Sequence, residues 1–452
     1  MSGVRTLIGS VIVWMRRRWR ALLSGAVVGL AAGLAITLWW FNHSFDVARR
    51  AFDRQDWSAA RAAVARYLVL HPRNPTALLL MAQTYIRDEK VAQEQAAQRA
   101  IEYLQRITDN STYAVDARTQ EAWVRLFMLH TPGRAEEILE RAIELDRFAV
   151  EPRYLLWKLY DLTGRSNLAE DIVWQVLNLT PEQDRAMRLR EWYMSQFFPL
   201  TGCMGLDYRL GLLAEGQVPT VDVERERFLL FRNAEPDRAL GHAALGRWLT
   251  REGMPQVALE VLQLAEKQLP PDQQASPFFL ATMIEVCIDL GKFDDAKSYF
   301  ARWPAEDRGF EYWRWRGVLA EEVHSDFQGA VEAYDQALRR WPGPVDWRMR
   351  VRKANCLARL GRAEEAARVR QEAQHIESQM SNAVHERLRR LLANLNDRAA
   401  LLAMAEFYRD LGRAREAASW LQLALKLPVT ATQPVPGDSS ESPQESATPP
   451  GP

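Results

Sequence analysis

The stretch LGHAALGRWLTREGMPQVALEVLQLAEKQLP, from Leu240 to Pro270, decides the fold. Apolar residues recur at helical spacing on both sides of Gly253, which marks a turn between two helices. Small residues stand at Gly246 and Ala258, where crossing helices leave no room for longer side chains. Pro270 ends the second pattern, because a proline cannot continue a helix. The stretch therefore predicts two antiparallel helices that cross at small residues.

The same pattern returns elsewhere, at Ala48–Ala60–Pro72, at Trp157–Gly164–Ala169–Pro181 and at Ala405–Gly412–Ala417. Repetition with a period of roughly 30–40 residues indicates a stacked helical array. Each pair alone cannot bury its apolar face, so neighbouring pairs must share a continuous core. We therefore predict an all-α fold, an α-solenoid of stacked antiparallel helix pairs, over residues 46–181 and 236–428.

One unit carries enough of the pattern to resemble a known family. The chain resembles the tetratricopeptide repeat (TPR) family at these positions: Leu156, Trp157, Tyr160, Gly164, Ala169, Val173, Val176 and Pro181. That family's repeat has about 34 residues in two antiparallel helices. The resemblance implies a concave groove lined by the first helix of each pair, which binds protein partners, often as an extended peptide.

The repeat pattern fails over residues 182–235, and no repeat can be aligned between about 199 and 235. We interpret this segment as a degenerate repeat, because residues 223–231 still have a helical pattern. An inserted elbow and a contact site are the alternatives. Cys203 lies here, and an enzyme would require a hidden site around it.

The N-terminus predicts a membrane anchor. Residues 21–41 carry no charge, and at about 1.5 Å rise per residue they can cross a hydrocarbon core of roughly 30 Å. Segment 1–20 is basic, and interface anchors are expected at Arg16, Arg17, Arg18, Trp39 and Trp40. This arrangement predicts a single-pass transmembrane helix with a cytoplasmic N-terminus and the repeats facing the periplasm. A cleaved signal peptide is the alternative.

Small residues also form a stripe within that segment, at Gly25, Gly29 and Gly33. Such a stripe lets two membrane helices approach closely and would allow a homodimer, although small residues are common in membrane spans. At the other end, residues 429–452 are rich in Pro and Ser, with almost no bulky apolar side chains. We predict that this tail is disordered.

The composition and motifs argue against an enzyme. Hydrophobic residues make up 48% of the 452 residues, and Lys+Arg equals Asp+Glu at 58 each, which disfavours a nucleic-acid binder. The three cysteines, Cys203, Cys287 and Cys356, form no CxxC pair, and the scattered histidines have no metal-ligand partner at i+4. We expect no catalytic residues, no cofactor and no metal.

Function must then come from the surface of the array. The best basic cluster on first helices comprises Arg314, Arg316, Arg348, Arg352 and Asn355, which could grip a terminal carboxylate as some family members do. Solvated helix faces with intrahelical pairs are the alternative. We expect a membrane-tethered scaffold that recruits or organises proteins at a bacterial envelope. The alternative is a cytoplasmic-side adaptor that regulates an envelope enzyme or its degradation.

Overall fold

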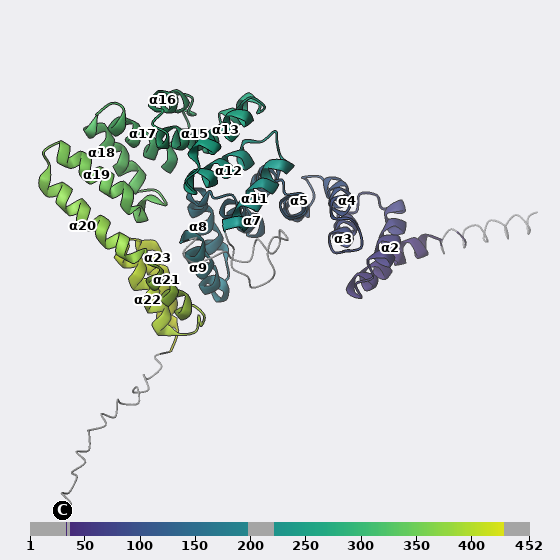
Figure 1. The fold of residues 1–452 in the computed structure, drawn as a ribbon. Helices are drawn as coiled ribbons and strands as arrows, with labels where there is room; N and C mark the ends of the chain where they lie inside the picture. Colours follow the sequence, from purple (N-terminus) through teal and green to yellow (C-terminus); the bar gives the residue numbers. More distant parts are fainter. Residues whose placement is uncertain (1–32, 34–36, 198–220, 429–452) are drawn as a thin grey trace, which may run out of the picture. The chain divides into compact units, whose positions relative to one another are not determined.

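The computed structural model describes residues 33, 37–197 and 221–428. Every regular element within these ranges is a helix, and they contain no strand (Figure 1). The all-α prediction is therefore confirmed. The chain divides into two compact units, Met1–Ser378 and Gln379–Pro452, and each is described separately.

The first helix pair begins earlier than its sequence pattern indicated. Residues 37–53 form one uninterrupted helix, whereas the sequence predicted a span ending at Phe41 and a new helix from Asp46. The partner helix α2 (Trp57–Leu70) begins at Asp56, whose carboxylate accepts from the backbone N–H of Ala59 at 3.0 Å. Such a cap satisfies one of the free N–H groups at a helix start.

Three further pairs follow in the first half of the array. They are α3 (Pro75–Ile86) with α4 (Gln93–Gln105), α5 (Ala114–Phe127) with α6 (Pro132–Leu145), and α7 (Glu151–Leu162) with α8 (Ala169–Leu179). A short 3-10 turn, η1 (Ser166–Leu168), precedes α8. Alanines at the crossings, such as Ala77, Ala100 and Ala142, are fully buried, as the small-residue pattern requires.

Two helices occupy the described part of the segment in which the repeat pattern fails, α9 (Glu182–Gln196) and α11 (Val221–Ala234). Helix α11 packs against the first helix of the next pair. Residues 198–220, including Cys203, lie outside the described residues. The interpretation of 182–235 as a degenerate repeat remains a prediction.

The second half of the array has its helices close to the predicted ranges. The pairs are α12 (Ala239–Arg251) with α13 (Pro255–Glu266), α15 (Pro277–Asp289) with α16 (Phe293–Ala301), α17 (Phe310–Glu322) with α18 (Phe327–Leu338), and α19 (Trp347–Arg359) with α20 (Ala363–Gln379). Short turns, α14 (Pro271–Gln274) and η2 (Gly343–Val345), join some of them. Gly253 has a φ of +78°, a conformation that favours glycine at the turn.

The second compact unit contains three further helices, α21 (Asn382–Leu391), α22 (Arg398–Asp410) and α23 (Ala414–Lys426). Met404, Tyr408 and Trp420 form its core and are fully buried. Helices α22 and α23 pack on each other as the predicted final pair.

The predicted membrane segment lies largely outside the described residues. Only Gly33 and residues 37–41 of the range 21–41 are described, and Arg16, Arg17, Arg18, Gly25, Gly29 and the tail 429–452 are not. Among the helices that are described, none combines the length and the apolar character needed to cross a membrane. The anchor, its homodimer and its topology therefore remain predictions.

Candidate partner-binding groove

The structure separates the five predicted groove residues into two groups. The first group is Arg314 and Arg352, which are bound within the array. Arg314 on α17 donates to Glu285 at 3.1 Å, and its guanidinium lies 4.3 Å from the Trp315 ring centroid. Arg352 on α19 donates to Glu321 at 2.9 Å. Both arginines are occupied by contacts within the protein.

The second group is Arg316, Arg348 and Asn355, whose side chains are exposed. Arg316 lies 5.3 Å from the ring centroid of Trp313, and Arg348 lies 4.9 Å from that of Trp347. Within the described part of the chain, neither guanidinium has a carboxylate at ion-pair distance. These two guanidinium groups are the cations of the predicted cluster that remain available to a ligand.

Arg314 belongs to a ring of four charges that the sequence did not reveal. Arg247 on α12 pairs with Glu285 on α15 at 3.3 Å and with Glu311 on α17 at 2.8 Å. Arg314 closes the ring against the same two carboxylates, at 3.1 and 3.8 Å. The four side chains alternate in sign and join the first helices of three successive pairs.

This ring stays ionised although it is largely buried. Burial alone would raise the pKa of the Glu311 carboxyl, but Arg247 and Arg314 hold that pKa below its ordinary value. Burial likewise opposes ionisation of Arg314, and Glu285 and Glu311 keep its pKa above its ordinary value. Opposite charges in close contact favour the charged forms of both partners. The ring is neutral as a whole and fixes three first helices relative to one another.

A cavity of about 560 Å³ lies beside the ring. Its wall includes Glu311 from the ring, the aromatic side chains of Phe278 and Trp341, and the basic side chains of Arg339 and Arg340. The Phe278 ring is in contact with two guanidinium groups. Its centroid lies 4.7 Å from the guanidinium of Arg247 and 5.9 Å from that of Arg165. A cavity of this size, with aromatic walls and a few charges, can accept side chains of a peptide.

A second cavity, of about 640 Å³, contains Asn355 in its wall. Glu321, Glu322, Arg359 and Arg370 also line it, as does Cys356, which is 1% exposed. Burial raises the pKa of Cys356 to about 12 and that of Cys287 to about 11. Both thiols are therefore protonated and unreactive at neutral pH. The described ranges contain no cluster of His, Cys, Asp and Glu suited to hold a metal ion.

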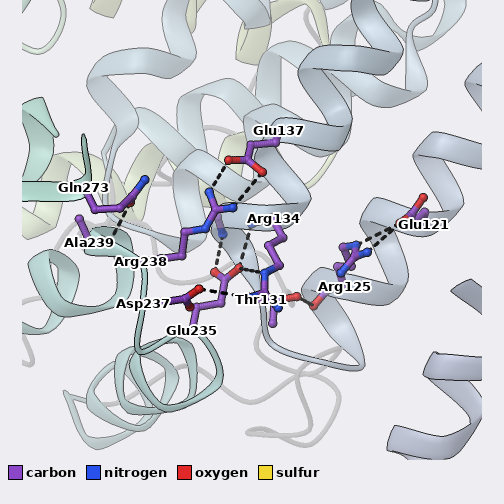
Figure 2. Close-up of polar contacts among 11 residues, drawn as sticks. Glu121, Arg125, Thr131, Arg134, Glu137, Glu235, Asp237, Arg238, Ala239 and Gln273 are labelled. Atoms are coloured by element: carbon purple, nitrogen blue, oxygen red, sulfur yellow. Dashed lines mark hydrogen bonds and ion pairs between the residues drawn. The ribbon is translucent and has the colours of Figure 1, made fainter. Parts of the chain in front are cut away.

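Contacts between segments that are distant in sequence join the two halves of the array (Figure 2). Glu235 accepts from the backbone N–H groups of Gly133 at 2.7 Å and Arg134 at 2.9 Å, so it caps α6 from about a hundred residues later. Both terminal nitrogens of Arg238 donate hydrogen bonds to the carboxylate of Glu137. These bonds attach the start of α12, and with it Arg247, to the first half of the array.

Part of the array is similar to a known family. Residues 319–380 match the model of the tetratricopeptide repeat family. The matched segment contains α18, α19 and α20, and it includes Arg348, Arg352 and Asn355. No curated protein matches the chain. The family match agrees with the helix pairing observed in the array.

Solved structures that match the chain are distant. The MamA protein is 16% identical, with 51% of this chain and 91% of that chain covered and a TM-score of 0.25. PilF of Pseudomonas aeruginosa is 17% identical, with 51% and 93% covered and a TM-score of 0.25. The Cut9–Hcn1 hetero-tetramer of the APC/C is 13% identical, with 85% and 76% covered and a TM-score of 0.35.

Proposed function

We propose that the protein is a membrane-tethered scaffold that binds an acidic, extended segment of a partner protein in the groove of its helical array. The observation that carries the proposal is the pair of exposed guanidinium groups, Arg316 and Arg348, each beside a tryptophan on a first helix. Arginine binds carboxylates through paired hydrogen bonds, and adjacent aromatic rings provide apolar contact area. The neighbouring charged ring holds the helices in place, while Arg316 has only a 3.5 Å contact with the Tyr312 hydroxyl and neither cation has a carboxylate partner among the described residues.

The tether in this proposal is the uncharged segment 21–41, which is long enough to cross a bilayer. Its preceding arginines favour a cytoplasmic N-terminus, which would place the array in the periplasm of a bacterial envelope. Reporter fusions after Asp438 test this arrangement. A periplasm-active reporter should be active and a cytoplasm-active reporter inactive, and the reverse pattern would favour a cytoplasmic adaptor.

A photo-crosslinking amino acid in place of Asn355, an exposed position on the first helix α19, tests the groove in living cells and leaves both cations in place. We expect a discrete crosslinked product, which disappears when Arg348→Glu is added, because the reversed charge repels an acidic segment. The matched control places the same crosslinker at Gln263, an exposed position on the second helix α13. Equal products from both positions, or a product that survives Arg348→Glu, would contradict the proposal.

Stability measurements should distinguish the exposed arginines from the arginines that are paired within the array. Arg348→Glu should change the free energy of unfolding by less than about 0.5 kcal/mol, because the side chain is exposed and has no carboxylate partner. Arg314→Met should lower it by about 1–3 kcal/mol, because Glu285 and Glu311 lose a partner in a partly screened site. Urea denaturation of both variants measures this difference.

A further inference from the structure

Exposed apolar side chains gather at one end of the first helix pair. At the start of the helix 37–53, Trp39 is 63% exposed and Trp40 is 48% exposed. At the end of α2, Val69 is 68% exposed and Leu70 is 39% exposed. Leu38, 41% exposed, completes the set, which we call the first-pair surface. Bulky apolar residues this exposed, and this close together, indicate a surface for an interaction.

Contacts between the two helices place these residues at the same end of the pair. His71 Nε2 lies 2.7 Å from Asn42 Oδ1, and the rings of Phe45 and Tyr67 stack with centroids 4.9 Å apart. The Arg66 guanidinium lies 5.1 Å from the Trp40 ring centroid. The end of α2 therefore lies beside the start of the helix 37–53, although about thirty residues separate them in sequence.

Basic side chains predominate at this end, and the nearest acid on the same helix is Asp46, which lies 3.8 Å from His43. Residues 37–45 and 64–74 contain no acidic side chain, while Arg66 and the exposed Arg73 lie among them. Arg106, also exposed, donates to the Pro72 carbonyl at 2.8 Å and adds a third cation nearby. The opposite end of the pair differs, because it carries the exposed acids Asp53 and Asp56. The first-pair surface is thus both aromatic and basic.

We infer that the first-pair surface rests in the headgroup region of a bilayer that contains anionic lipid. This inference depends on the proposed tether, because the helix 37–53 continues the sequence of the predicted span and begins where that span would leave the hydrocarbon core. Tryptophan concentrates at membrane interfaces, and basic residues near the surface are attracted by anionic headgroups. The aromatic and basic character of the surface fits this environment.

The inference implies that the array is held at a defined angle to the membrane. Residues 37–53 form one helix without a break, and residues 37–41 of that helix also belong to the predicted span. Contact through α2 as well as through Trp39 and Trp40 would fix the rotation of that helix. The groove would then face a set direction relative to the membrane plane.

A spin label at Val69→Cys measures this contact in the full-length chain reconstituted into vesicles of phosphatidylcholine and phosphatidylglycerol. Cys203 is replaced by Ser, and the buried Cys287 and Cys356 are left in place. The control label is at Ala59→Cys, an exposed position at the opposite end of the same helix pair. Collision with oxygen reports a lipid environment, and collision with a nickel chelate reports water.

We expect the ratio of oxygen to nickel collisions to be severalfold higher at position 69 than at position 59. The ratio at position 69 should fall toward the control in phosphatidylcholine alone and in the Arg73→Glu variant. A water-like ratio at position 69, in a chain that still resists alkaline extraction, would overturn the inference and leave the tether intact. Release of the chain by alkali would instead overturn the tether. Low collision rates with both reagents, together with dipolar broadening, would show that a second copy covers the surface and would also overturn the inference.

Discussion

At the scale of single residues, Gly241 determines how closely α11 approaches α12. A Cβ atom at this position would lie 2.5 Å from the backbone nitrogen of Arg232 and 2.7 Å from its Cα. At Gly246 the added atom would instead meet the side chain of Leu262, with Cδ1 at 2.7 Å. A side chain can change rotamer, whereas a helix backbone must move as a whole.

Gly241→Ala should therefore destabilise the protein more than Gly246→Ala. We expect about 1–3 kcal/mol for Gly246→Ala, the usual cost of overpacking a core, and a larger loss for Gly241→Ala. Urea denaturation followed by circular dichroism measures both. A smaller loss for Gly241→Ala would mean that α11 can move away from α12 without cost.

A buried carboxylate on α7 adds a pH dependence at the same scale. Burial raises the pKa of Asp161 to about 6, although the Lys158 ammonium, 3.9 Å away, opposes the shift. The Ser195 hydroxyl on α9 donates to Asp161. Because the folded pKa is above the unfolded value of 3.8, the native state binds more protons between pH 4 and 6. This carboxyl therefore makes the protein less stable as the pH rises through that window.

Asp161→Asn should remove this contribution, since the amide does not titrate. We expect the difference in unfolding midpoint between wild type and variant to change from pH 4 to pH 6, with the wild type losing stability relative to the variant as the pH rises. Thermal unfolding at several pH values measures the difference. Parallel pH profiles would show that Asp161 titrates at its ordinary pKa in the folded protein.

At the scale of secondary structure, the start of α6 depends on a residue outside its own repeat. Thr131 provides no side-chain cap, and the carboxylate of Glu235 accepts from two of the first N–H groups instead. Glu235 is 1% exposed, and burial raises its pKa above the ordinary value, although the two backbone donors oppose this shift. The capping carboxylate is thus shielded from water, and its bonds to α6 join the two halves of the array.

Glu235→Ala should lower the free energy of unfolding by about 1–3 kcal/mol, because two buried N–H groups lose their acceptor. Glu235→Gln should cost less, since its amide oxygen can still accept. The matched control is Asp237→Ala, because the side chain of Asp237 is 56% exposed and its pairing with Arg134 contributes little. Equal losses at positions 235 and 237 would contradict a specific role for the cap.

The helix pairs could be predicted from sequence because their signals are local. Helical periodicity, the turn at Gly253 and the small residue at Gly246 all lie within one repeat, and the structure places α12 and α13 within a few residues of the expected ranges. The groove could be predicted only in part. Arg314 pairs with Glu285, 29 residues away on another repeat, and Arg247 pairs with Glu311, 64 residues away, and no local pattern specifies such pairs.

At the scale of the first compact unit, distant repeats touch one another directly. The ring of Trp341, after α18, lies 5.7 Å from that of Trp192 on α9, and its centroid is 6.3 Å from that of Phe197. Repeat arrays usually derive their stability from contacts between neighbours only, so their parts can unfold in steps. These long-range contacts couple the two halves and favour a single transition.

Trp341→Ala should therefore reduce the cooperativity of unfolding as well as its midpoint. We expect a lower denaturant m-value or a second transition, because the halves can then open separately. The matched control is Trp303→Ala, which removes a ring packed against Phe300 and Tyr312 nearby in sequence. That control should shift the midpoint and keep the m-value. An unchanged m-value in both variants would show that the halves are coupled by other contacts.

The distant cap on α6 has a consequence for the order in which the chain is made. Glu235 follows Gly133 by 102 residues, so the ribosome completes α6 well before it adds the carboxylate that closes its start. At about 5–20 residues per second, the delay is roughly 5–20 s. During that interval only water can satisfy the N–H groups of Gly133 and Arg134. The native cap of α6 therefore cannot form until translation has passed the end of α11 and added Glu235.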